Sequence, residues 1–157
     1  VTAWGKLFRR ELLETERFPD VKLHEDEALI YKLLYRSRQV AMVDGALYLY
    51  TANQGGLMAN RFTPERMTML DILDERLAFY RENGETGDLI RFTQNRQFMF
   101  AAEYYLHTAD NKPFRRKARK KQWALYWPLM RSSYWPRRKL VYTYAMLLPG
   151  HFKKLYF

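Results

Sequence analysis

Apolar residues recur at helical spacing between residues 25 and 38. Leu29, Ile30, Leu33 and Leu34 fall at positions i, i+1, i+4 and i+5, which is one face of a helix. Three acidic residues open this stretch and two arginines close it. This order of charge favours a helix, because acids stabilise the N-terminal end of the helix dipole and cations the C-terminal end. The pattern therefore predicts an amphipathic helix over residues 25–38.

Two further helices are predicted downstream. The first begins at Thr63, which is a typical capping residue, with Pro64 at the first helical position. It runs to about residue 83, and its buried stripe is predicted to consist of Leu70, Leu73, Leu77 and Tyr80. The second covers about 88–107, and its apolar side is predicted to consist of Leu89, Phe92, Met99 and Leu106.

The other stretches have shorter patterns. Residues 3–13 predict a short strand or turn that runs into a helical turn. Residues 40–43 and 46–50 are β-prone, and the Asp44-Gly45 pair between them predicts either a hairpin turn or a bend between strand pieces. Residues 53–60 have the Gly and Asn content of a loop. After residue 111, three prolines predict two or three short helical pieces, because proline ends or kinks a helix: Pro128, Pro136 and Pro149.

Composition excludes several classes of protein. Hydrophobic residues make up 48% of the 157 residues, which is enough for a real core and excludes a disordered chain. Cysteine is absent, so disulfides and thiolate zinc sites are excluded, and the three histidines are too scattered to form a metal cluster. The longest uncharged run after residue 111, residues 140–152, is too short for a membrane-spanning helix. Since the chain opens on Val1 without a leader pattern, we expect it to begin inside a longer protein.

The net charge of +10 is unevenly distributed along the chain. Residues 112–157 contain 13 basic residues and no acidic one, together with 11 of the 26 aromatic residues. The remaining 14 basic and 17 acidic residues give residues 1–111 a net charge of −3. The chain therefore consists of a slightly acidic body and a basic, aromatic tail, which we call the tail (residues 112–157).

The acidic cluster Glu25-Asp26-Glu27, which follows His24, is the sharpest local motif. One interpretation is structural, because acids in a first helical turn stabilise the helix through its dipole and free N–H groups. The other is functional, because a carboxylate at this position can serve as a general base that takes a proton from an attacking hydroxyl.

The order of motifs resembles the second half of the catalytic domain of bacterial family 2 glycosyltransferases. The resemblance covers roughly residues 3–80 and lies in four motifs in order. These are Trp4-Gly5-Lys6-Leu7-Phe8-Arg9-Arg10-Glu11-Leu12, Phe18-Pro19, the acidic cluster followed by Tyr31-Lys32-Leu33-Leu34, and Leu47-Tyr48-Leu49-Tyr50 before a Gly/Asn loop.

This resemblance implies a GT-A fold and transfer of a sugar from a nucleotide-sugar donor with inversion. It implies that Asp26 is the general base, with Glu25 as its neighbour, and that Trp4 and Lys6 line the acceptor side, although Trp4 is equally well explained as a core residue. Arg61 would contact the donor diphosphate, although a solvated loop cation is the commoner case. The family usually neutralises the diphosphate with a divalent metal, Mg or Mn, held by an Asp-x-Asp motif. This chain has no such motif, so we expect the metal and the donor half of the site to lie outside it.

Three interpretations of the tail remain open. Lys and Arg among Trp and Tyr are typical of a segment at the headgroup level of anionic lipid, and this interpretation fits best. The aromatic residues can instead form the core of a helical subdomain or an oligomer interface. A nucleic-acid surface is the least favoured, because no recognised motif is present.

We therefore predict an α+β, predominantly helical chain, namely the C-terminal part of a GT-A (Rossmann-like α/β) glycosyltransferase domain with a helical extension. Its predicted regions are a partial catalytic domain at 1–62, a helical region at 63–110 and a basic helical tail at 111–157. The acceptor would be a saccharide or a lipid-linked sugar of the cell surface. The location would be cytoplasmic, with peripheral contact to the inner face of the membrane. This part alone would be inactive. The alternative is a non-enzymatic basic module that binds anionic membrane or nucleic acid.

Overall fold

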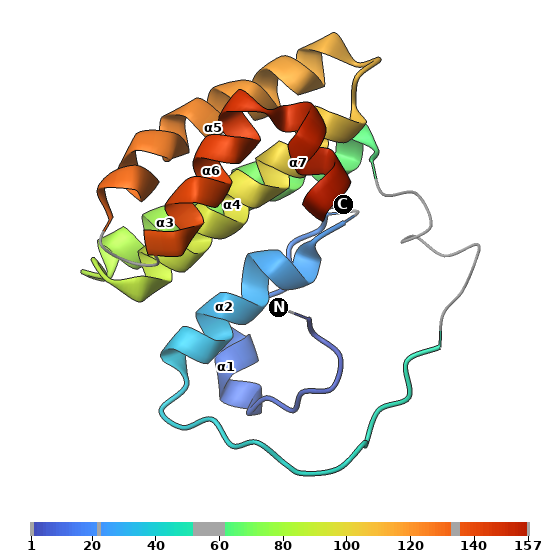
Figure 1. Cartoon of the computed structure of the whole chain (residues 1–157). Helices are drawn as coiled ribbons and strands as arrows, with labels where there is room; N and C mark the ends of the chain where they lie inside the picture. The colour runs from blue at the N-terminus through green and yellow to red at the C-terminus, as the bar shows by residue number, and fades with distance from the viewer. Residues whose placement is uncertain (1, 22, 52–61, 133–135, 157) are drawn as a thin grey trace. The chain divides into compact units, whose positions relative to one another are not determined.

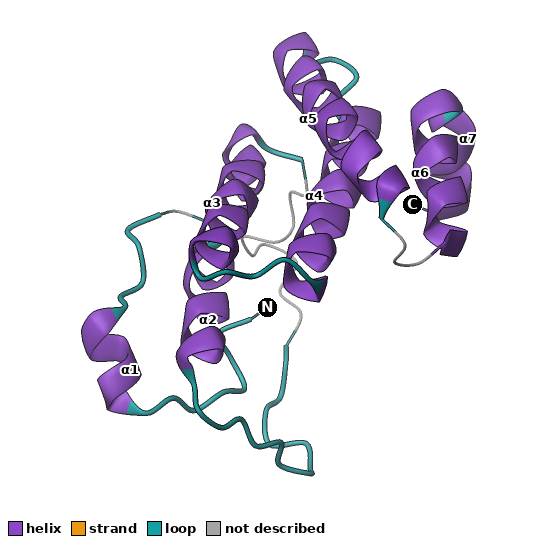
Figure 2. Ribbon diagram, turned by 90° about the vertical axis from the view of Figure 1, so that its left-hand side faces the viewer, coloured by secondary structure: helices purple, strands orange, loops and turns teal. Residues whose placement is uncertain are grey.

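The computed structural model describes residues 2–21, 23–51, 62–132 and 136–156, and these contain helices joined by turns and loops (Figures 1 and 2). No β-strand occurs in these described ranges (Figure 2). The chain divides into two compact units, residues 1–72 and 73–157. The division into regions at 1–62, 63–110 and 111–157 stays a prediction.

The first unit contains α1 (Arg10–Thr15), α2 (Glu25–Arg36), the 3-10 helix η1 (Pro64–Met67) and the beginning of α3 (Thr68–Glu82). Leu29, Ile30 and Leu33 of α2 form its buried cluster, as the helical spacing predicts, and the N-terminal segment covers them. The partly buried residues that pack against this cluster are Ala3, Phe8, Leu12, Leu13 and Leu34.

An ion pair network fastens the segment after α1 to the last turns of α2. Glu16, whose side chain is 15% exposed, pairs with Arg36 at 2.8 Å and with Lys32 at 3.8 Å. The helix then ends at Arg36, where the Ser37 hydroxyl donates to the Leu33 carbonyl oxygen at 2.7 Å. The helix predicted over 25–38 is thus confirmed, with its end two residues earlier.

The helix predicted from Thr63 is also confirmed, but it starts differently. Pro64 takes the first position, yet the first turn is the 3-10 helix η1, and the Thr63 side chain makes no capping hydrogen bond. Instead the Thr68 hydroxyl donates to the Glu65 carbonyl oxygen at 2.7 Å, where η1 passes into α3. The predicted stripe is correct, because Leu70, Leu73, Leu77 and Tyr80 are all buried.

Residues 40–51 follow a course without regular secondary structure, and their side chains are exposed. The strand pieces predicted at 40–43 and 46–50 are therefore not seen, because a strand needs a neighbouring strand to pair its N–H and C=O groups. The bend predicted at Asp44-Gly45 is present: Gly45 has φ +119°, and its carbonyl oxygen accepts the Leu47 N–H at 3.2 Å. The loop predicted at 53–60 lies outside the described residues.

The second unit holds the rest of α3 together with α4 (Asp88–His107), α5 (Lys112–Arg131), α6 (Pro136–Leu147) and α7 (Pro149–Tyr156). Helices α4 and α5 form a helical hairpin, joined by a short turn that ends where the Asn111 side chain accepts the Phe114 N–H at 3.2 Å. α6 and α7 pack against this hairpin. The core that they share consists of Phe98, Ala102, Leu125, Leu129, Tyr142, Ala145, Met146 and Phe152.

Two predictions for this unit need correction. Of the apolar side predicted for α4, Met99 and Leu106 pack against the shared core, whereas Leu89 and Phe92 are 38% and 48% exposed. The buried side carries Thr93 and Gln97 among its apolar residues. Pro128 does not end a helix, because α5 continues through it to Arg131, whereas Pro136 and Pro149 begin α6 and α7, where the missing N–H costs nothing.

Candidate functional site

The predicted catalytic acids stand in the first turn of α2. Glu25 is exposed, Asp26 is half-buried and Glu27 is buried. One carboxylate oxygen of Asp26, Oδ1, accepts the backbone N–H of Glu27 at 2.7 Å. This bond satisfies one of the free donors at the helix start and fixes the orientation of the carboxylate. The Oδ2 atom accepts no hydrogen bond from the described residues, so Asp26 can hold the helix end and still accept a proton.

His24 precedes these acids in an unusual backbone conformation. Its φ of +67° is left-handed, and it is the one non-glycine residue with positive φ in the described ranges. The ring is half-buried, and Nε2 has no hydrogen-bond partner among the described residues. Burial, followed by the positive charge of Arg66, lowers the pKa of His24. The imidazole is therefore neutral near pH 7 and adds no positive charge beside the acidic cluster.

An exposed aromatic cluster lies in the same unit. Trp4 stacks on Tyr48, with ring centroids 5.1 Å apart, and lies at a tilt to Tyr50 at 5.5 Å. All three rings keep about half of their surface open, between 47% and 60%. Trp4 follows Ala3, which packs on the α2 cluster, so the sequence next to the ring is fixed to the helix that carries Asp26. Trp4 is thus an exposed residue and not a core anchor.

The predicted site residues are only partly brought together. Lys6 is exposed, and its ammonium group donates to the Thr2 hydroxyl at 3.3 Å. In the part of the chain that the structure describes, neither Trp4 nor Lys6 makes a hydrogen bond, ion pair or ring contact with Glu25 or Asp26. Arg61, the predicted phosphate contact, lies outside the described residues.

A metal site does not fit the described residues. No group of three or more histidine or acidic side chains among them is close enough to hold an ion. The prediction of a divalent metal bound elsewhere stays a prediction.

Tyr48 and Tyr50 were not predicted as site residues. Their signal is the alternation Leu47-Tyr48-Leu49-Tyr50, which places two aromatic rings on one side of an extended segment. Their contact with Trp4, 44 residues or more away in the chain, depends on tertiary structure. Exposed aromatic rings that lie close together offer a surface on which an apolar face of a ligand can stack.

Comparison with known proteins relates the chain to a glycosyltransferase. It is 33% identical over 85 residues to the protein named Glycosyltransferase GlyA of Streptococcus pneumoniae serotype 4 (strain ATCC BAA-334 / TIGR4). The matched region covers 54% of this chain and 12% of that protein. No family model matches the chain, and no solved structure matches it.

Proposed function

We propose that this chain is the acceptor-side part of an inverting family 2 glycosyltransferase with a GT-A fold. The observation that carries the proposal is the similarity to Glycosyltransferase GlyA. The ordered motifs between residues 3 and 80 support the finer assignment. Because the chain covers 12% of that protein's length, the activity, donor and acceptor are proposed for a longer enzyme that contains this chain.

In the proposed reaction, Asp26 is the general base. The acceptor hydroxyl attacks the anomeric carbon of the nucleotide sugar, the bond from that carbon to the diphosphate breaks, and the hydroxyl proton passes to the carboxylate of Asp26. The diphosphate leaves with both bonding electrons, and the anomeric configuration inverts in a single displacement. The fixed Oδ1 supports this role, since a carboxylate already held by the Glu27 N–H has little rotational freedom to lose.

Trp4, Tyr48 and Tyr50 form the proposed acceptor platform, and Lys6 beside Trp4 supplies a cation for acceptor oxygens. The exposed β-prone run 40–50 supports a GT-A assignment, because it would find its strand partners in the remainder of such a sheet. Donor binding and any divalent metal are proposed to belong to residues outside this chain. The non-enzymatic alternative has no comparable support.

The test is a pair of carboxylate-to-amide changes in the longer enzyme. Asp26→Asn keeps an oxygen for the Glu27 N–H, so α2 is retained while the proton acceptor is lost. We expect turnover to fall by about 10²–10⁴-fold with little change in nucleotide-sugar affinity measured by calorimetry. Asp20→Asn, an exposed aspartate between α1 and α2 that is not a predicted site residue, is the matched control and should keep most of the activity. Near-normal turnover in Asp26→Asn would remove this residue from the mechanism.

A further inference from the structure

The cations of α5 fall into two structural groups. The first group serves the fold of the second unit. Arg115 and Arg119 lie over the Tyr105 ring, at 4.4 and 4.9 Å from its centroid, and Arg119 also donates to the Met146 carbonyl oxygen at 2.6 Å. Lys121 pairs with Asp74 of α3. These three cations have internal partners, and their positions are explained by the packing.

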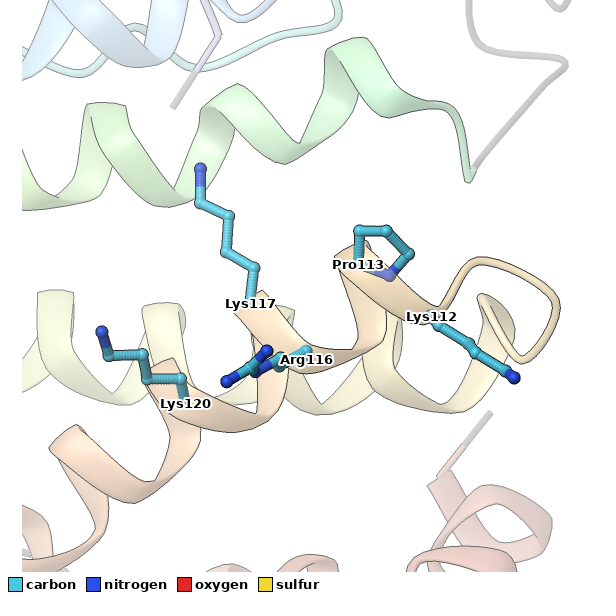
Figure 3. Close-up of a pocket in the computed structure, with 5 residues that line it drawn as sticks. All are labelled: Lys112, Pro113, Arg116, Lys117 and Lys120. Carbon is cyan, nitrogen blue, oxygen red and sulfur yellow. The ribbon is translucent and has the colours of Figure 1, made fainter.

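The second group faces an open groove with a volume of about 600 Å³. Figure 3 shows its side chains extending from one helix, and the lining consists of Lys112, Pro113, Arg116, Lys117 and Lys120. Lys112, Arg116 and Lys120 are exposed and make no ion pair or hydrogen bond with another described residue. No acidic residue lies in the first turn of α5. The charged side chains that line the groove are therefore all cationic.

This charge works against the stability of α5 itself. Cations in the first turn of a helix oppose its dipole, and acids there would each contribute roughly 0.3–1 kcal/mol of stabilisation. α5 instead begins with Lys112 and continues with cations through its first three turns. Within this run, Lys112, Arg116 and Lys120 have no ion-pair or hydrogen-bond partner among the described residues, which points to an anionic partner outside the chain.

Two exposed tryptophans lie on the same side of α5 as these cations. Trp123 and Trp127 are 48% and 57% exposed. At 3.6 residues per turn, residues 112, 116, 120, 123 and 127 fall within an arc of roughly 80° and extend over about 22 Å of helix. The opposite side of the helix is buried and carries Ala118, Gln122, Leu125 and Leu129. Because that side is packed, the side of α5 with residues 112, 116, 120, 123 and 127 faces outward.

The orientation of the indole rings is supported by neighbours on the same helix. Tyr126 meets Trp123 edge-on at 5.9 Å and Trp127 at 5.2 Å, and its hydroxyl is bonded to the Thr143 hydroxyl of α6 at 3.2 Å. Tyr126 therefore anchors both exposed rings to the body of the unit. Indole rings in this setting are typical of the headgroup level of a bilayer, with cations beside them at the lipid phosphates.

We propose that this outward line of α5, Lys112, Arg116, Lys120, Trp123 and Trp127, is a docking surface for an anionic lipid bilayer. Charge complementarity supports the choice of occupant, and the order of the residues supports a bilayer over a nucleic acid. Single-stranded nucleic acid is bound where aromatic rings lie along a cationic groove that follows the backbone, whereas here three cations come first and two rings follow. None of the described helices is long and apolar enough to cross a membrane, so the contact would be peripheral.

The experiment is co-sedimentation of the 157-residue chain with vesicles of phosphatidylcholine alone or with about 30% phosphatidylglycerol, over a series of salt concentrations. We expect binding to the anionic vesicles only, and weaker binding as salt rises. The triple variant Lys112→Gln, Arg116→Gln and Lys120→Gln should bind about 100-fold more weakly, at roughly fivefold for each cation. The matched control is Lys139→Gln, Lys153→Gln and Lys154→Gln. It removes the same number of positive charges from α6 and α7, and its affinity for the vesicles should fall much less.

A second measurement tests the insertion of the rings without any change of charge. Lipids brominated on the acyl chain should quench Trp123 and Trp127 fluorescence in single-tryptophan variants, and should leave Trp4 unquenched. Equal losses in the two triple variants, binding that is indifferent to lipid charge, or unquenched Trp123 and Trp127 would overturn the proposal. Preference for a single-stranded oligonucleotide over anionic vesicles would also overturn it.

Discussion

Asp74 of α3 joins three helices of the second unit. Its Oδ1 accepts a hydrogen bond from the side-chain amide of Gln97 on α4 at 2.8 Å, and its Oδ2 pairs with Lys121 on α5. Gln97 is fully buried, whereas the Asp74 side chain is 48% exposed. Two substitutions separate these interactions: Asp74→Ala removes both, and Asp74→Asn keeps an oxygen for Gln97 while it removes the charge.

The magnitudes follow from the burial of each partner. A buried amide that loses this acceptor costs about 1–3 kcal/mol. The ion pair is worth about 0.2–1 kcal/mol, because solvent screens the half-exposed carboxylate. We therefore expect Asp74→Ala to lower the free energy of unfolding by about 1–4 kcal/mol, and Asp74→Asn by less than about 1 kcal/mol.

The assay is urea unfolding followed by circular dichroism at 222 nm, with thermal midpoints as a second measure. A loss of 1 kcal/mol shifts the midpoint of a unit of this size by roughly 4–8 °C. Addition of salt should narrow the difference between wild type and Asp74→Asn and leave most of the Asp74→Ala effect. If the two variants are equally destabilised, or if Asp74→Ala is neutral, the buried amide does not depend on this carboxylate.

Three further results are expected. Pro128→Ala restores a helical N–H in α5 and should raise the thermal midpoint, with a gain of up to about 3 kcal/mol; an unchanged midpoint would show that the missing N–H costs α5 nothing measurable. Because burial lowers the pKa of His24 in the folded state, the unfolded chain takes up a proton first as pH falls below about 6.5, so stability should decline there. In His24→Asn the asparagine tolerates the left-handed backbone, and the decline should be absent. If the free energy of unfolding has the same pH slope in this variant and in the wild type, His24 is not the cause of the decline. In the longer enzyme, Trp4→Ala should raise the acceptor KM roughly five- to tenfold with little change in kcat, and a pure kcat loss would speak against the platform.

Helices with a regular apolar stripe could be predicted from the sequence, and α2 and α3 are the examples. The full buried face of α4 could not, because it includes Gln97, whose amide donates to Asp74, a partner 23 positions away. The length of α5 was missed for a different reason. Pro128 cannot donate to the carbonyl four residues earlier, yet packing of Leu125 and Leu129 against the shared core holds the helix past it. At the candidate site, local sequence indicated Asp26 and Trp4, whereas the pairing of Trp4 with Tyr48 and Tyr50 required the fold.

The hydrogen bond from Arg119 to the Met146 carbonyl has a consequence for the order of folding. Met146 lies in the last turn of α6, where carbonyl groups have no partner within their own helix, so α5 supplies the cap of α6 from outside. α4 and α5 are neighbours in sequence and can close their hairpin first, at low entropic cost. α6 would then form on this template, and its amide hydrogens should exchange with deuterium before those of the hairpin.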